Sequence, residues 1–482
     1  MNPSLFLSLL ALGLLFVLPA CDVGDDDDAA DDDDAVDDDD AVDDDDSADD
    51  DDSADDDDSA ADDDDDKPSA EPAEVLVEFE VETNYEAYVH TSVNNGHYSL
   101  RDSADQLHVA WTNESDQPVV GTRSSDGSWQ QQTLSSHAAT GELRNPNLMQ
   151  RGEDFVVGWI ERDGAESHLV LAEGVLQEPG ADPAHMWTTR HVESIPWIDA
   201  STEPKYLTMA LSTEGALFGF TEGNPDVQGR VFGESGELAM SPLRSGLEQL
   251  LPGTYEKSSD VALDAAGDFA VVVWEENWSL RGPGQDANLV FSTSIDGGNT
   301  WSPAKHLLAS GPMPGGDPSV FCTADGTTYL AFQKPEPVNL GGIYAARRLP
   351  GEEYFSLIDA PGMDTLGRIG SGWLAAIDGL PDRFAVAWEQ TDGEYMDKWE
   401  HRVAVAFVAD ANTNPEVTYG PITESPPGDD TSYDLAANVS LAADGARVDV
   451  FWTHVDDDEA PGLNLKLMHR VDLASEGTSS KP

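Results

Sequence analysis

The sequence predicts an all-β fold, a β-propeller of about seven four-stranded blades, with six or eight blades as alternatives. A short apolar strand that ends in an aromatic residue recurs through residues 73–475, and these aromatic residues follow one another at intervals of 48 to 64 residues. No amphipathic helical stretch competes with these strands, and 42 Gly and 29 Pro punctuate the chain. Short strands repeated about every 50 residues are typical of propeller blades.

Each repeat is marked by an aromatic anchor at the end of its expected second strand, usually after a turn signal such as Asp325-Gly326. The fourth repeat shows the expected order best, with strands at 260–263, 269–274 and 288–292 and an outer strand after Trp301. The seven anchors are Trp111, Trp159, Phe220, Trp274, Phe332, Trp388 and Trp452.

The seventh repeat lacks an outer strand of its own. It has expected strands at 438–441, 447–453 and 463–469, followed only by a polar tail. Residues 74–82 alternate between apolar and polar side chains, as a half-buried strand does. We therefore expect this N-terminal strand to complete the seventh blade and to protect the open edge of the ring.

The first residues read as an export signal. Leu5 to Ala20 form one apolar run, so residues 1–20 are expected to be a signal peptide. Leu18, Ala20 and Cys21 resemble the lipobox of bacterial lipoproteins, with an unusual Pro19. The resemblance implies that Cys21 carries a lipid and anchors the protein to a membrane of the bacterial cell envelope. An ordinary secretory signal with a chance cysteine is the alternative.

Residues 21–72 are expected to be a lipidated cysteine followed by a disordered spacer. Six Asp quartets recur every six residues from Asp25, and a quintet ends the tract at Asp66. Such a segment buries no apolar surface and its charges repel one another. A diffuse calcium store is the alternative, although the ligand spacing is not that of an EF-hand. Residues 476–482 are expected to be a disordered tail.

The charge balance argues against two kinds of partner. The chain has 95 acidic and 24 basic residues, a net charge of −71, and it still carries −41 without the thirty Asp residues up to Asp66. Nucleic acids and anionic lipid surfaces need a cationic face on the protein, so neither is an expected partner. With Cys21 acylated, Cys322 would be the remaining thiol, and we expect it to pack as a small buried hydrophobic residue.

One motif is specific. Ser294, Asp296, Gly298, Thr300 and Trp301 match the pattern S-x-D-x-G-x-T-W. At these positions the chain resembles the Asp-box (BNR) repeat of sialidase-like propellers. The resemblance implies a structural turn on the face opposite an active site, not sialidase activity itself.

Sialidase activity would need an arginine cluster and a Tyr-Glu nucleophile pair, as the same resemblance implies. Arg144-Asn-Pro is similar to the sequence around the first of these arginines. Tyr255, Tyr433 and Arg368 lie near expected blade junctions, but the sequence assigns them no role. HExxH, GxSxG, CxxC and glycine-rich phosphate loops are absent from the body of the sequence. Arg144, Glu275 and Glu389 are therefore weak catalytic candidates.

A ligand site is expected on the face where the second strands end. Acidic residues that follow the anchors would form a rim there, and long loops add aromatic residues; such a mixture suits sugars, cationic ligands or calcium. Solvated glutamates on an acidic protein are the alternative. His185 and His191, six residues apart, do not have the spacing of a metal pair, so no metal ligands are assigned. The candidate residues are Glu161, Glu222, Glu275, Glu276, Trp278, Glu389, Tyr395 and Trp399.

The sequence thus favours a surface-displayed, lipid-anchored propeller that acts as a binding or scaffold module for a glycan, protein or cation. The alternative is an extracellular sialidase-like glycoside hydrolase. Neither the binding module nor the hydrolase requires a cofactor, although calcium is compatible with both.

Overall fold

The chain divides into two compact units, Met1–Lys67 and Pro68–Pro482, and the computed structural model describes residues of the second. The predicted signal peptide, Cys21, the Asp tract and the tail 476–482 lie outside the described residues. In the part that is described, no helix is both long and apolar enough to cross a membrane. The described residues are 73–81, 97–102, 106–113, 115, 117–123, 128–137, 142–164, 166–177, 185–196, 204–222, 230–233, 236–237, 255–278, 288–334, 341–359, 366–371, 373–391, 401–420, 423, 432–456 and 463–473.

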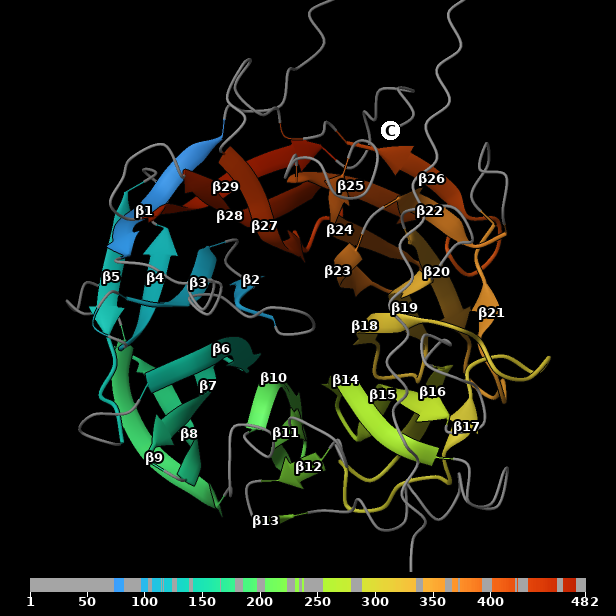
Figure 1. The fold of residues 1–482 in the computed structure, drawn as a ribbon, viewed down its shortest axis with the longest axis horizontal. Coiled ribbons are helices and arrows are strands. Elements are labelled where there is room, and N and C mark those ends of the chain that lie inside the picture. Colours follow the sequence, from blue (N-terminus) through green and yellow to red (C-terminus); the bar gives the residue numbers. More distant parts are fainter. Residues whose placement is uncertain are drawn as a thin grey trace, which may run out of the picture. The chain divides into compact units, whose positions relative to one another are not determined.

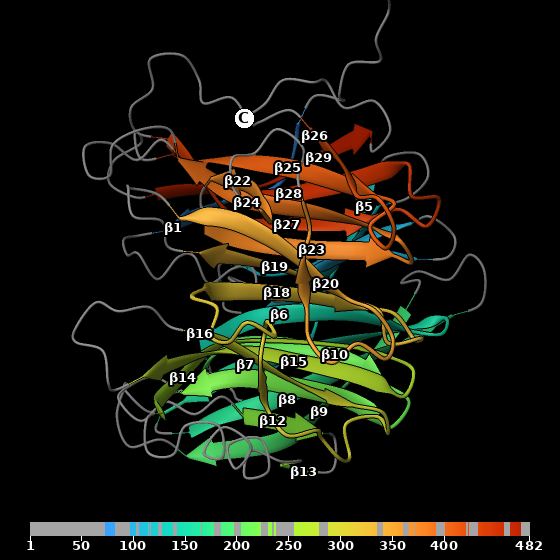
Figure 2. The same cartoon turned by 90° about the vertical axis from the view of Figure 1, so that its right-hand side faces the viewer.

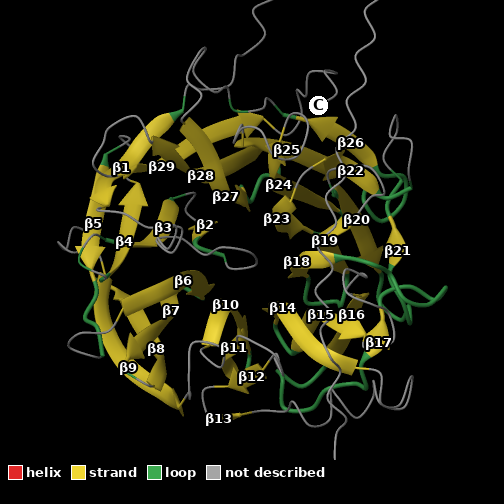
Figure 3. Cartoon of the chain, viewed as in Figure 1, coloured by secondary structure: helices red, strands yellow, loops and turns green. Residues whose placement is uncertain are grey.

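The described residues form strands and no helix, which confirms the all-β prediction (Figure 3). The strands pair into seven antiparallel sheets, arranged as the blades of a β-propeller around a central axis (Figure 1). In the side view, the blades surround this axis and neighbouring strands of a blade run in opposite directions (Figure 2). Each of the seven expected repeats supplies one sheet.

Blades 1 to 3 have four strands each. Blade 1 contains β2 (Ser99–Arg101), β3 (Leu107–Thr112), β4 (Pro118–Arg123) and β5 (Trp129–Thr133). Blade 2 contains β6 (Glu142–Arg151), β7 (Asp154–Asp163), β8 (Glu166–Leu176) and β9 (His185–Pro196). Blade 3 contains β10 (Pro204–Ser212), β11 (Gly215–Glu222), β12 (Arg230–Gly233) and β13 (Gly236–Glu237).

The strands of every blade are given from the axis outward. Blades 4, 6 and 7 have four strands, and blade 5 carries a fifth. Blade 4 contains β14 (Tyr255–Ala266), β15 (Phe269–Trp278), β16 (Asn288–Ser294) and β17 (Lys305–His306). Blade 5 contains β18 (Gly316–Cys322), β19 (Thr328–Lys334), β20 (Gly342–Arg348), β21 (Ser356–Leu357) and β22 (Arg368–Ser371). Blade 6 contains β23 (Trp373–Leu380), β24 (Arg383–Thr391), β25 (His401–Ala409) and β26 (Glu416–Tyr419). Blade 7 contains β27 (Ser432–Leu441), β28 (Arg447–Asp456), β29 (Leu463–Leu473) and β1 (Glu74–Val81).

The aromatic anchors end up between blades because successive residues of a strand face opposite sides of its sheet. Each anchor lies on the second strand of its blade, and the six whose side chains are described are at most 3% exposed. Trp159 packs with residues of blades 1 and 2, Trp274 with blades 3 and 4, and Trp388 with blades 5 and 6. The hydrophobic core is therefore a series of inter-blade clusters, and Cys322 belongs to the one between blades 4 and 5, as expected.

The N-terminal strand closes the ring, as predicted. β1 pairs antiparallel with β29, from Glu74 opposite His469 to Val81 opposite Leu463. The last blade therefore combines three strands from the C-terminal end of the body with one strand from its start (Figure 1).

Polar contacts join the inner strands of neighbouring blades all the way around the ring. Every one of the seven junctions has at least one hydrogen bond between inner-strand segments, mostly between a short polar side chain and a backbone group. The contacts are His97 O–Leu148 N, Asn147 with Leu207 O and Met209 N, Thr208 Oγ1–Leu263 O, Asp264 Oδ2–Cys322 N, Ser319 Oγ–Ile377 N, Asp378 Oδ2–Leu441 N and Ser99 Oγ–Asn438 Oδ1.

Two of these contacts use buried aspartates. Asp264 accepts the N–H of Cys322 at 2.6 Å, and Asp378 accepts the N–H of Leu441 at 2.7 Å. Burial raises the pKa of Asp264 to about 7 and that of Asp378 to about 6, and the backbone hydrogen bonds only partly oppose this. Both side chains therefore bind protons in the folded state at a pH where they are ionised in the unfolded chain.

We expect the propeller to lose stability as the pH rises from about 4 to about 7. In this window the native state holds more protons than the unfolded state, so the free energy of unfolding falls with pH. A raised pKa of this size corresponds to on the order of 2–4 kcal/mol for Asp264. Urea unfolding at several pH values should show this slope, and Asp264→Asn should flatten it because asparagine does not ionise.

The control for this pH series is Asp444→Asn, which removes an exposed carboxylate (side chain 53% accessible). It reports the general relief of charge repulsion in an acidic protein. An Asp264→Asn slope equal to that of Asp444→Asn would contradict the assignment.

The predicted Asp-box segment forms a closed turn between β16 and β17. Asp296 accepts hydrogen bonds from Thr300 N at 2.8 Å and Thr300 Oγ1 at 2.6 Å, and Ser294 Oγ donates to it at 2.8 Å. Gly298 has a φ of 95°, and a Cβ there would lie 2.8 Å from a methyl group of Leu217 in blade 3. The turn thus holds the end of blade 4 against blade 3. Because Ser294 pairs with Ala270 at the start of β15, it lies at the blade end opposite Glu275 and Glu276.

Candidate ligand site on the rim face

We use the term rim face for the end of the propeller where the second strands end and the inner strands begin. The antiparallel register brings these ends together: Tyr255 is opposite Trp278 in blade 4, and Trp373 is opposite Glu389 in blade 6. The acidic residues after the anchors therefore lie on one face, as expected. What each carboxylate does there depends on which side of its strand it occupies.

Two of the predicted rim carboxylates bind the anchors. Glu161 accepts the indole N–H of Trp159 at 2.8 Å, and Glu276 accepts that of Trp274 at 2.7 Å. Each glutamate follows its tryptophan by two residues, so both side chains lie on the same side of the strand. Glu161 and Glu276 are fully buried, and Glu161 also accepts the backbone N–H of His137 at 2.8 Å. Their first role is to satisfy buried donors.

Four other acidic residues gather near the axis, on blades 4, 5 and 6; we call them the channel carboxylates. They are Asp260 on β14, Glu275 on β15, Asp317 on β18 and Glu389 on β24. Glu275 reaches the next blade, because its Oε2 lies where a Cβ on Gly316 would come within 3.0 Å. Asp317 is the following residue, and the charges of Asp260 and Glu389 both act on it.

The pKa of Asp317 is raised to about 7, first by burial and then by the neighbouring charges of Asp260 and Glu389. Asp317 is therefore partly protonated near neutral pH. In this form it can donate a hydrogen bond, and the oxygens of the neighbouring carboxyls can accept one. A hydrogen-bond donor next to several acceptors can bind hydroxyl groups. The same pair of groups, a protonated and an ionised carboxyl, can carry out general acid–base catalysis.

Backbone bulges place the two aspartates. Asp260 and Asp317 have φ values of 44° and 45°, a region that Asp tolerates better than most residues. The pairing of each inner strand with its neighbour is interrupted at this point, between Ser259 and Ala262 in blade 4 and between Gly316 and Ser319 in blade 5. A bulge re-aims the side chain at its position.

Asp260 and Asp317 were not predicted as site residues. Both are aspartates on the inner strands of consecutive repeats, whereas the prediction considered only the acidic residues that follow the anchors. Glu275 and Glu389 were selected, and the structure places both near Asp317.

Several predicted site residues cannot be placed. The side chains of Glu222, Trp278, Arg144, Tyr255 and Tyr433 are not among those described, and Tyr395 and Trp399 lie outside the described residues. Arg368 lies on β22, which pairs with β20, the third strand of blade 5. It therefore belongs to the outer half of its blade, away from the inner strands.

His185 and His191 belong to different surroundings, although both lie on β9. His185 packs edge-on against Phe155, with ring centroids 4.9 Å apart, and next to His108. His191 stacks on His137 at 4.5 Å instead. The pairing of β9 with β8 is regular from His185 to His191, so the two histidines are separated simply by their distance along the strand.

No protein-family model matches the sequence, and no curated protein matches it. Solved structures align with the chain at low identity. The polysaccharide lyase Uly1 aligns over 84% of this chain and all of its own, with 11% identity and a TM-score of 0.47.

A sialidase and a viral hemagglutinin-neuraminidase also align. The Trypanosoma rangeli sialidase bound to the inhibitor DANA aligns over 82% of this chain and 60% of its own, with 11% identity and a TM-score of 0.39. The parainfluenza virus 5 hemagglutinin-neuraminidase ectodomain aligns over 69% of this chain and 82% of its own, with 7% identity and a TM-score of 0.40. Similarity at this level does not assign an activity to the chain.

Proposed function

We propose that this protein is a glycan-binding propeller displayed on the bacterial cell envelope, with its ligand held by the channel carboxylates on the rim face. The observation that carries the proposal is the meeting of Asp260, Glu275, Asp317 and Glu389 from three consecutive blades. Carboxyl groups accept hydrogen bonds from sugar hydroxyls, and a protonated Asp317 can also donate one.

The charge of the protein favours a neutral glycan over an acidic one. The chain has a net charge of −71, and the channel carboxylates add their own negative field to the site. A sialic acid carboxylate would be repelled there unless arginines neutralised it. Arg368, one of the arginines singled out in the sequence, lies on the outer half of blade 5.

Glycoside hydrolysis is the second candidate, and the pKa of Asp317 favours it. Glycosidases use one carboxyl as a proton donor and a second as base or nucleophile. Asp317, with a pKa of about 7, fits the first role, and Glu389, whose charge acts on it, fits the second.

Binding of the full chain to an array of neutral and acidic glycans tests the proposal. We expect neutral glycans to bind, and Asp317→Asn and Glu389→Gln each to weaken binding about 10- to 100-fold, the effect of losing a charge-assisted hydrogen bond. Glu353→Gln is the matched control, because Glu353 is exposed and pairs with Lys305 at the outer strands. Unchanged binding by both site variants would contradict the proposal.

The same samples distinguish binding from hydrolysis and test for calcium. Release of free sugar by the native chain, lost in Asp317→Asn, would identify a hydrolase. Repeating the assay with calcium and with EDTA shows whether the carboxylates hold calcium as part of the site.

Display on the envelope is the remaining element of the proposal, and it depends on Cys21 and the acidic spacer. We expect Cys21→Ser to release the protein from membrane to soluble fractions, because this one residue would carry the lipid attachment. Fractionation of cells expressing both forms measures this. Membrane association of a mature Cys21→Ser protein would contradict lipid anchoring.

A further inference from the structure

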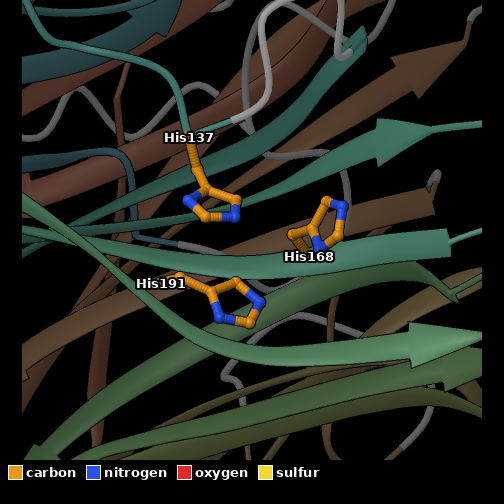
Figure 4. Close-up of side chains that lie close together, drawn as sticks. All are labelled: His137, His168 and His191. Atoms are coloured by element: carbon orange, nitrogen blue, oxygen red, sulfur yellow. The ribbon is translucent and has the colours of Figure 1, made fainter.

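Three histidines from separate segments meet at one point of blade 2. His168 lies on β8, His191 on β9, and His137 in the connection between β5 and β6. Each offers a ligand atom, and these atoms lie within 4.8 Å of one another. Figure 4 shows the three imidazole rings grouped with nitrogen atoms facing a common space.

The rings are held in this arrangement by neighbouring groups. The hydroxyl of Ser194 lies 3.0 Å from Nδ1 of His168 and 3.0 Å from Nε2 of His191, so one group orients both rings. The backbone N–H of His137 donates to Glu161, which also accepts the indole N–H of Trp159. The buried anchor of blade 2 thus fixes the segment that carries His137.

The exposure of the three rings suits a metal site. His168 is buried, His191 half-buried and His137 exposed, so the group has a closed side formed by protein and an open side that faces solvent.

We propose that His137, His168 and His191 form a binding site for a divalent transition metal of the Zn²⁺ class. Three imidazoles with a fourth position open to water or a ligand make a tetrahedral zinc site. Imidazole nitrogens prefer zinc, copper or nickel, whereas the oxygen ligands of the Asp tract prefer calcium and magnesium. The metal would tie the connection between blades 1 and 2 to the outer strands of blade 2.

Metal titration of the full chain tests this site. Excess calcium should be present to occupy the carboxylates of the acidic tract, which are hard oxygen ligands. Calorimetric titration with zinc is then expected to show one tight equivalent, and cobalt is expected to give the intense absorption of a four-coordinate site. His137→Ala and His168→Ala should each weaken zinc binding at least about 100-fold, and Ser194→Ala, a positioning change, about 10-fold.

The matched control is His454→Ala, which removes a half-buried histidine on β28, away from blade 2. Zinc should raise the melting temperature of the native chain and of this control but not of the cluster variants. Should His168→Ala fail to fold, the exposed His137→Ala decides the question. Equal zinc affinity and an unchanged cobalt spectrum in His137→Ala would overturn the proposal.

Discussion

Deleting residues 67–83 is expected to open the propeller ring and to cause aggregation or the loss of several kcal/mol of unfolding free energy, well above a typical surface change. β1 pairs with β29 from Glu74 to Val81, so the deletion exposes a long unpaired edge. The last blade then keeps only three strands, with β29 at its outer edge. Size-exclusion chromatography and urea unfolding measure the two effects.

A deletion at the other end of the chain is the control. Removing the residues after Ser475 takes away a polar segment that follows the last residue of β29, Leu473. We expect little change in solubility or in the urea midpoint. If the deletion of 67–83 behaved in the same way, β1 would not close the ring.

Asp449→Ala is expected to destabilise the protein by about 3–5 kcal/mol, because it leaves two buried partners without their carboxylate. Asp449 is fully buried on β28; it accepts from His469 Nε2 at 2.9 Å and from Arg101 of blade 1 at 2.8 Å. Burial alone would raise the pKa of Asp449, but the hydrogen bonds and charges of His469 and Arg101 outweigh it and lower the pKa. The ionised carboxylate therefore joins blade 7 to blade 1, the junction that closes the ring.

The exposed pair Lys305–Glu353 provides the comparison. Its atoms are also close, with Nζ 2.9 Å from Oε1, but the Glu353 side chain is 63% accessible. Glu353→Ala should cost less than about 1 kcal/mol, since exposed ion pairs are screened by water. Urea unfolding of the two variants should separate them clearly, and equal effects would show that Asp449 is not essential to the junction.

The sequence by itself determined the elements and their order. Alternation of apolar residues, a turn before each second strand and an aromatic at its end are local patterns, and the strands of blades 4 and 7 appear where these patterns place them. Ring closure was also predictable, because a seventh repeat without an outer strand leaves an edge that residues 74–82 can cover. The pairing of β1 with β29 confirms this.

Only the tertiary structure decided which polar side chains meet. Glu275 and Glu276 are neighbours in the sequence, yet Glu276 binds the anchor Trp274 while Glu275 reaches Gly316 in the next blade. A strand directs successive side chains to opposite faces, so a list of acids after the anchors cannot say which of them share a site.

The same reason explains the residues that the sequence analysis did not find. Asp317 joins the channel carboxylates because a bulge changes the direction of its side chain, and a bulge has no clear local pattern. His137, His168 and His191 are separated by 31 and 23 residues. They meet because β8 pairs with β9 and the segment after β5 brings His137 next to them. Strand pattern is a property of a few adjacent residues, whereas a binding site depends on how blades and their connections pack in space.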